Sequence, residues 1–268
     1  MVRSSKAFGL LGRDVLSLLN SGTHLIEEED GYQPGLPIKG YKARLRLKPG
    51  AVPIFAPCRE PPLALEDDVN KEIDQMEKDR VISKVNGGSQ WASPLVVARK
   101  PNGKIRICVD YKITVNPHIM RDSCNAPPIE TIFSKIGDCQ FFAKFDLKAA
   151  FWQIELEENS KNLTTINTTR GLYQFNRLPF GLKTSSAIFQ KSMLIICEHL
   201  EGIVVYQDDI LVYGHTAEEL KARVEKLLKR LHKKNVVINW DKSTRQCGET
   251  TFLGHDEVLQ EILNLSTK

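Results

Sequence analysis

The sequence predicts an α+β fold, because helical segments are interspersed with antiparallel hairpins. Two hairpins support this prediction. The first joins two β-branched runs by the turn Asn102-Gly103, the strongest local hairpin signal in a sequence. The second, residues 203–213, folds two apolar runs around the adjacent carboxylates Asp208 and Asp209. Before the first hairpin, apolar residues recur every three or four positions, which predicts amphipathic helices.

Composition limits the class of protein. The 268 residues are 41% hydrophobic, enough to bury one large core or two smaller ones. The 37 basic residues are nearly balanced by 33 acidic ones, so the net charge of +4 permits nucleic-acid binding without requiring it. The six cysteines form no C-x-x-C pair, which argues against a zinc site or a disulfide framework. No apolar run approaches the roughly 18 residues of a membrane span, so we expect no membrane partner.

The amino-terminal third combines two helical patterns with a proline-rich stretch. Residues 10–19 have the pattern of a short amphipathic helix. Residues 20–61 contain six prolines and one alternating segment, Lys42–Leu47, which predicts a strand within a linker. From Pro62 to Arg80, apolar residues at helical spacing predict a helix with one buried face.

The remaining elements follow from the same periodicities. In chain order we expect strands at 94–100 and 105–110, a helix at 129–136, a strand at 140–147, strands at 163–167 and 172–175, a helix at 185–200, the carboxylate hairpin at 203–213, a basic helix at 218–234, and strands at 236–239 and 250–253.

Three aspartates are the candidate catalytic and metal-binding residues: Asp146, Asp208 and Asp209. Two divalent cations about 3.5–4 Å apart can activate an attacking hydroxyl and stabilise a leaving pyrophosphate, and Mg²⁺ prefers carboxylate oxygens. Successive strand residues face opposite sides, so Asp208 and Asp209 can share one site only at the tip of their hairpin. We expect Asp208 to be the direct ligand and Asp209 the looser partner. Taken alone, an Asp-Asp pair is also an ordinary turn sequence.

The order of the motifs resembles the reverse transcriptases of gypsy-type LTR retrotransposons over residues 40–255. The matching segments are Trp91–Pro94, Arg106–Tyr111, Phe142–Leu147, Leu163–Thr168, Leu178–Leu182, the carboxylate hairpin and Phe252–His255. The resemblance implies a right-hand polymerase palm, in which an antiparallel sheet packs on helices, and a fingers subdomain that carries the first hairpin. It also implies that Asp146 and Asp208 bind two Mg²⁺ ions, with Mn²⁺ as a substitute, and that Asp209 is the second aspartate of the family's Tyr-x-Asp-Asp box.

Basic residues of the fingers hairpin match those that meet the incoming triphosphate in this family. Arg106 is the firmest match, and a guanidinium suits bidentate phosphate binding. Lys100 and Lys104 match as well, although a solvated hairpin face explains them equally. The basic helix 218–234 allows phosphate contacts to a primer–template, or an ordinary solvated face.

Four further residues match positions around the nascent base pair. Phe151 matches the aromatic steric gate that disfavours a ribose 2′-OH, with a core aromatic as the alternative. Phe180 and Gly181 match the loop beside the base pair, where glycine permits a close backbone approach. Gln190 matches a residue placed to contact the template, with a polar helix face as the alternative.

The resemblance also predicts the domain organisation. Residues 1–20 resemble the carboxy-terminal remnant of a retropepsin-like aspartic protease, although its Asp-Thr-Gly signature is absent. Residues 21–61 are expected to be linker and lead-in, residues 62–255 the fingers and palm, and residues 256–268 the truncated start of a thumb. With the thumb largely missing, affinity and processivity are expected to be poor.

The leading hypothesis is an RNA-directed DNA polymerase that extends a primer 3′-OH with deoxynucleoside triphosphates on an RNA or DNA template. We expect it to be intracellular, in the cytoplasm and in retrotransposon particles. The first alternative is a truncated, non-catalytic relic that binds nucleic acid without turnover. The second is a structural α+β interaction module. The sequence assigns no oligomeric state.

Overall fold

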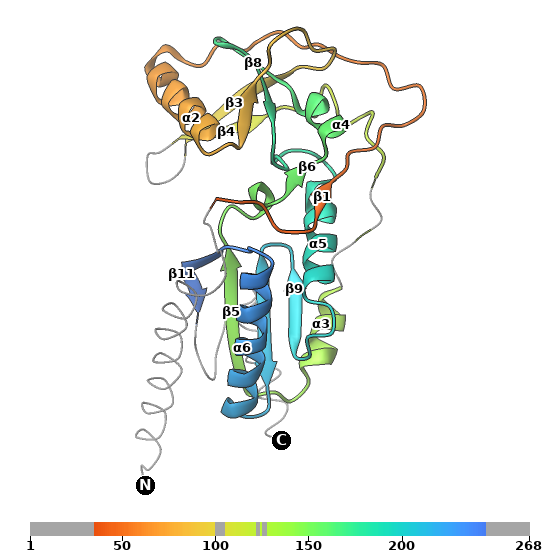
Figure 1. The fold of residues 1–268 in the computed structure, drawn as a ribbon, viewed down its shortest axis with the longest axis vertical. Helices are drawn as coiled ribbons and strands as arrows, with labels where there is room; N and C mark the ends of the chain where they lie inside the picture. The colour runs from red at the N-terminus through yellow and green to blue at the C-terminus, as the bar shows by residue number, and fades with distance from the viewer. Residues whose placement is uncertain (1–34, 100–104, 122–123, 125–127, 245–268) are drawn as a thin grey trace. The chain divides into compact units, whose positions relative to one another are not determined.

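A computed structural model describes residues 35–99, 105–121, 124 and 128–244 of the chain. These residues form two compact units (Figure 1). The first unit contains residues 35–39, 128–148 and 190–244, and the second contains residues 40–99, 105–121, 124 and 149–189. Helix α5 (Ser185–Ile196) begins in the second unit and ends in the first. The predicted protease remnant, Lys100, Lys104 and the predicted strand 250–253 lie outside the described residues.

The first unit is built on a four-stranded antiparallel sheet of order β11-β5-β10-β9. Its strands are β5 (Phe141–Leu147), β9 (Ile203–Tyr206), β10 (Asp209–Gly214) and β11 (Ile238–Thr244). The two inner strands are β5 and β10, and their register places Asp146 opposite Asp209 and Lys144 opposite Leu211. The register of the inner strands therefore brings two of the predicted site residues together.

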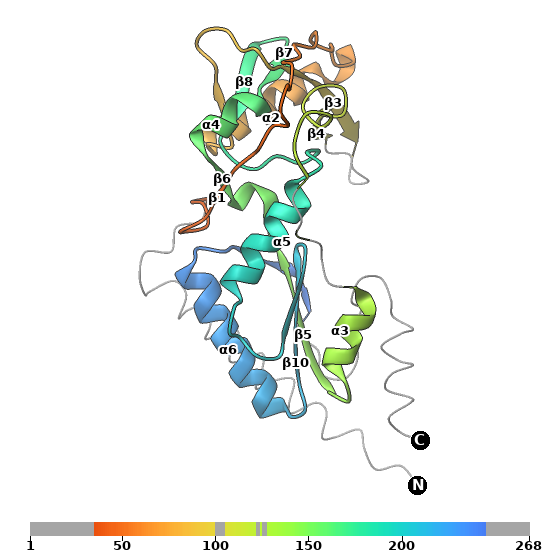
Figure 2. The same ribbon diagram turned by 90° about the vertical axis from the view of Figure 1, so that its right-hand side faces the viewer.

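Helices cover both faces of this sheet, as the edge-on view in Figure 2 shows. On one face, buried Ile132 and Ile136 of α3 (Ile129–Ile136) pack against Phe142, Val204 and Leu211. On the other, α6 (Ala217–Lys233) contacts β5 and β10 and buries four apolar side chains at helical spacing. Because both faces are buried, the register of β5 and β10 is strongly specified.

The second unit contains a five-stranded sheet of order β2-β8-β7-β3-β4. Its strands are β2 (Ile82–Lys84), β3 (Ser93–Arg99), β4 (Ile105–Val109), β7 (Ile166–Thr168) and β8 (Gly171–Phe175). All neighbours are antiparallel except β3 and β7. Helix α2 (Glu66–Lys78), preceded by the 3-10 turn η1 (Leu63–Leu65), buries Val69, Ile73 and Met76 as its periodicity predicts.

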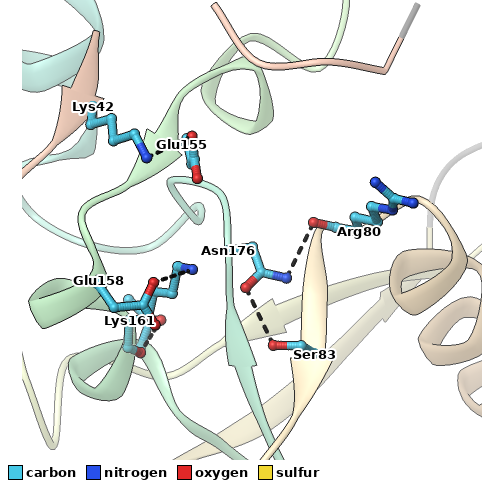
Figure 3. A network of polar contacts seen from close by, with 8 residues as sticks. Lys42, Arg80, Ser83, Glu155, Glu158, Lys161 and Asn176 are labelled. Atoms are coloured by element: carbon cyan, nitrogen blue, oxygen red, sulfur yellow. Dashed lines mark hydrogen bonds and ion pairs between the residues drawn. The ribbon is translucent and has the colours of Figure 1, made fainter.

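Short elements complete the second unit. They are β1 (Lys42–Ala43), η2 (Ala150–Gln153), β6 (Glu155–Leu156), α4 (Glu158–Lys161) and η3 (Asn162–Thr164). Figure 3 shows polar contacts of this unit: Lys42 of β1 forms an ion pair with Glu155 of β6, and Lys161 pairs with Glu158 within α4. Beside the sheet, Asn176 donates to the carbonyl of Arg80 and accepts a hydrogen bond from Ser83. Arg80 has φ +57° and lies in a left-handed turn between α2 and β2. The Asn176 side chain therefore connects this turn to the end of β8.

The structure confirms the α+β class and most predicted elements, with two strands shorter than expected. The predicted strand 163–167 begins as the 3-10 turn η3, so only Ile166 and Asn167 of it belong to β7. The alternating segment Lys42–Leu47 forms only the two-residue strand β1 beside β6. Ala43 and Leu45 are buried as the alternation predicts, but the Leu45 amide bonds the hydroxyl of Ser160 rather than a strand. The partner strand β6 ends at Leu156, so the pairing ends there as well.

The five cysteines of the described residues are free thiols, and Cys139 and Cys197 are buried. No helix in this part of the chain combines the length and apolar character needed to cross a membrane.

Candidate active site

The carboxylate hairpin turns through two residues, Gln207 and Asp208, between Tyr206 and Asp209. Gln207 has φ +53°, as the first central residue of a tight two-residue hairpin requires. Asp208 is exposed at the tip, and Asp209 is the first residue of β10. Strand alternation allows the two aspartates to share one site only at the tip of the hairpin, and the structure places them there.

Asp146 lies directly across the sheet from Asp209. Cross-strand partners project from the same face, so the two carboxylates are neighbours beside Asp208. Burial raises the pKa of the Asp209 carboxyl, and the charges of Asp208 and Asp146 act in the same direction, whereas Lys144 lowers it. The net shift is upward, so the cluster disfavours the ionised form of Asp209.

Lys144 is the counter-charge of this cluster. Its ammonium lies 3.1 Å from the Oδ1 atom of Asp209, and the two side chains are 20% and 21% exposed. Lys144 and Asp146 are two residues apart on β5, so both face the side of the sheet that carries Asp209. This spacing was visible in the sequence, but the strand that pairs with β5 was not known.

The three aspartates do not form a ready-made metal cage. Within the part of the chain that the structure describes, no group of three or more His, Cys, Asp or Glu side chains is arranged to hold a metal ion. The donor set still fits a hard divalent cation, because it consists of carboxylate oxygens whose mutual repulsion a cation relieves. Asp146 and the exposed Asp208 are the residues suited to hold it, since Lys144 already pairs with Asp209.

Two polar side chains of β11 hold Asp146 in place. The Asn239 amide donates to Asp146 Oδ1 over 2.8 Å. The Ser243 hydroxyl accepts the Asp146 backbone N–H over 3.2 Å and donates to the Asn239 carbonyl over 2.7 Å. The pairing of Asn239 with Asp146 across β11 and β5 brings the Asn239 amide to the Asp146 carboxylate, and no sequence motif predicted this contact.

In the second unit, three predicted residues form one stack. The exposed guanidinium of Arg106, on β4, lies over the Phe180 ring with 4.8 Å between Cζ and the ring centroid. The Phe180 and Phe151 centroids are also 4.8 Å apart, and Phe151 further contacts Phe189 at 5.6 Å. Among the described residues Arg106 has no acidic partner within 4.0 Å, so its donors are available to an anionic ligand.

Gly181 is required by the protein's own backbone. Its φ is +92°, and a Cβ there would lie 2.9 Å from the Val109 carbonyl oxygen. Asn116 fixes the same loop, since its amide donates to the Gly181 carbonyl and accepts the Lys183 N–H, each over 2.9 Å. The close approach expected at Gly181 is therefore made to β4, and Asn116 is a supporting residue that sequence reasoning missed.

Gln190 is only 1% exposed. Its side chain bonds backbone groups of the carboxylate hairpin, at Val205 and Gln207. Both sequence interpretations, a template contact and a polar helix face, placed this side chain at a surface, and the structure differs from both. Lys100 and Lys104 lie outside the described residues.

The model of a reverse transcriptase (RNA-dependent DNA polymerase) domain matches residues 98–256, which is more than half of the chain. The chain belongs to the reverse transcriptase family. The match includes Arg106, Phe151, the Phe180–Gly181 loop and the three aspartates. It thus covers residues from both units.

Curated relatives carry the same segment within much longer proteins. An uncharacterized protein of Caenorhabditis elegans is 34% identical over 80% of this reverse transcriptase chain and 17% of its own length. The retrovirus-related Pol polyprotein from transposon 412 of Drosophila melanogaster is 30% identical over 80% of this chain and 18% of its own. The chain therefore spans less than a fifth of the length of these relatives.

A solved structure supports the fold. The foamy viral protease-reverse transcriptase in complex with an RNA/DNA hybrid aligns with 95% of this chain and 36% of its own, with a TM-score of 0.78. At 19% identity this similarity shows a shared reverse transcriptase fold.

The ion pair between Lys144 and Asp209 gives a direct prediction. In Lys144→Met the pKa of Asp209 rises further, because the neighbouring positive charge that lowers it is removed. Titration of the aspartate side-chain carbons by NMR measures the change, and Lys221→Met on the exposed face of α6 is the control. An unchanged Asp209 pKa in Lys144→Met would show that the ion pair does not form in solution.

Proposed function

We propose that this chain is the RNA-directed DNA polymerase segment of a retrotransposon Pol polyprotein and that it extends a primer 3′-OH with deoxynucleoside triphosphates. The observation that carries the proposal is the β5–β10 register, which places Asp146 against Asp209 beside Asp208. The family match and the Pol polyprotein relatives support it. The proposed partners are an RNA or DNA template and its primer. The proposed location is the cytoplasm, including retrotransposon particles.

Each cluster has a distinct role in this proposal. Asp146 and Asp208 hold two Mg²⁺ ions, with Mn²⁺ as a substitute, and Asp209 stays paired with Lys144. When bound, the metal supplies charge stabilisation at the attacking hydroxyl and the leaving pyrophosphate. Asn239 fixes the orientation of the Asp146 carboxylate. Most of the rate enhancement then comes from positioning and electrostatics.

The second unit supplies recognition of the nucleotide. Arg106 donates to the triphosphate, and its position over Phe180 leaves its forked N–H groups free for bidentate bonds. Phe151 excludes the ribose 2′-OH, because its ring is held in place by contacts with the Phe180 and Phe189 rings. A ring fixed in this way discriminates by shape, since it cannot move aside for an extra hydroxyl.

Asp208→Asn is the first test of this function. The substitution removes the charge of the exposed ligand while keeping its size, and we expect Mg²⁺-dependent primer extension to fall at least about 10²- to 10³-fold on RNA and DNA templates. Asp67→Asn, at an exposed position on α2, is the matched control and should leave extension unchanged. Salt-dependent binding of the primer–template by the unmodified chain without any extension would instead identify a non-catalytic relic.

Phe151→Val is the second test. A smaller side chain opens space for the 2′-OH, so the preference for deoxynucleotides over ribonucleotides should fall about tenfold or more. The ratio of kcat/KM for the two substrates on one primer–template measures the preference. Phe55→Val, which removes an exposed ring from the same unit, should leave that ratio unchanged. An unaltered ratio in Phe151→Val would assign Phe151 to the core instead.

A further inference from the structure

The side chain of Gln190 makes hydrogen bonds to the backbone of the carboxylate hairpin of the kind that a neighbouring strand would make. It extends from α5 and is buried, and its Nε2 atom donates to the Val205 carbonyl over 2.9 Å. Its Oε1 atom accepts the Gln207 backbone N–H over 2.7 Å. A primary amide offers a donor and an acceptor side by side, which is the pattern a strand presents to its neighbour. Both bonds fall on the arm and tip of the hairpin that carries Asp208.

The ladder of the hairpin shows why these two backbone groups need a partner. The Tyr213 N–H bonds the Gly202 carbonyl, so residues 213 and 202 are a hydrogen-bonded pair. Such pairs alternate along an antiparallel ladder, which makes Asp209 and Tyr206 a bonded pair and Ile210 and Val205 a non-bonded one. The Val205 carbonyl therefore points away from β10.

The position of β9 in the sheet leaves that carbonyl without a strand partner. Strand β9 is an edge of the four-stranded sheet, so no strand of the described residues lies on the side to which the Val205 carbonyl points. The Gln207 N–H belongs to the turn and takes part in no ladder. Gln190 satisfies both groups with one side chain, and an unpaired buried backbone group would be costly.

We propose that Gln190 is a positioning residue that fixes the Gln207-Asp208 turn and so holds the Asp208 carboxylate in register with Asp146. This inference rests on the proposed function, because its consequence for activity requires that Asp208 be catalytic. Gln207 has a positive φ, a conformation that a residue with a side chain keeps only when its surroundings impose it. The two-residue turn sets this conformation and the Gln190 bond to the Gln207 N–H helps to hold it, whereas contact with the template is not needed to explain this residue.

The chemistry of the side chain makes the proposal specific. Methionine matches the length and volume of glutamine but can make neither bond. Ionised glutamate can accept from Gln207 but cannot donate to Val205, and its charge would be buried. Protonated glutamate regains one donor and one acceptor. The proposal therefore predicts that Gln190→Met and Gln190→Glu respond differently to pH.

Primer extension by the full chain tests the effect on catalysis. In Gln190→Met, we expect kcat to fall about 10- to 100-fold, because a displaced catalytic carboxylate no longer meets the reacting atoms. KM for the primer–template should stay within about twofold, whereas a template-contacting residue would raise it. Gln75→Met, at an exposed position on α2, is the control and should match the unmodified chain.

The pH dependence of kcat tests whether protonation restores the function of the side chain in Gln190→Glu. Burial raises the pKa of a glutamate at position 190, so lowering the pH from 8.5 to about 6 should protonate it. The kcat of Gln190→Glu relative to the unmodified chain should then rise several-fold, while the same ratio for Gln190→Met stays flat. A flat ratio for both variants would contradict the role of the amide pattern.

Hydrogen exchange tests the geometry without relying on activity. The Gln207 amide should be protected in the unmodified chain and lose protection about tenfold or more in Gln190→Met, while the Tyr213 amide of the same hairpin keeps its protection. Unchanged protection and unchanged kcat in Gln190→Met overturn the proposal. If the unmodified chain lacks polymerase activity, the proposed function fails, and the exchange result alone decides whether Gln190 fixes the turn.

Discussion

The antiparallel register between β5 and β10 is the constraint on which the candidate active site depends. It sets Asp146 opposite Asp209 and leaves Asp208 at the adjacent turn. A slip of one residue would move each side chain of the strand to the other face and separate the carboxylates. Buried packing opposes such a slip. Leu211 lies in the hydrophobic cluster that α3 covers, and α6 packs against β5 and β10.

Assembling the carboxylates has an electrostatic cost that nearby residues partly offset. The pKa of Asp209 is raised by its burial and by Asp208 and Asp146, even though Lys144 forms an ion pair with it. Asn239 donates to Asp146, so each of the two strand aspartates has a partner from its own sheet. Asp208 has the least support and the greatest exposure, which makes it the most available to a cation.

The sequence predicted elements with a local signature and missed contacts made across the sheet. Turn chemistry and hydrophobic periodicity located the carboxylate hairpin, α3 and α6 to within a few residues, because both signals are local. The partners of the aspartates could not be located, because Lys144, Asn239 and Ser243 approach them only through strand pairing. Gln190 was misplaced at a surface, since its burial depends on packing that no local pattern specifies.

Paramagnetic Mn²⁺ mapping tests the central claim, that this register assembles a cation site, most directly. In an NMR spectrum of the isotopically labelled chain, substoichiometric Mn²⁺ should broaden the amide signals of Asp146, Asp208 and Asp209 first. Asp208→Asn should suppress that broadening. Preferential broadening at the acidic first turn of α2, around Asp67, would contradict the account, because that cluster has ordinary surface carboxylates and no part in the proposed chemistry.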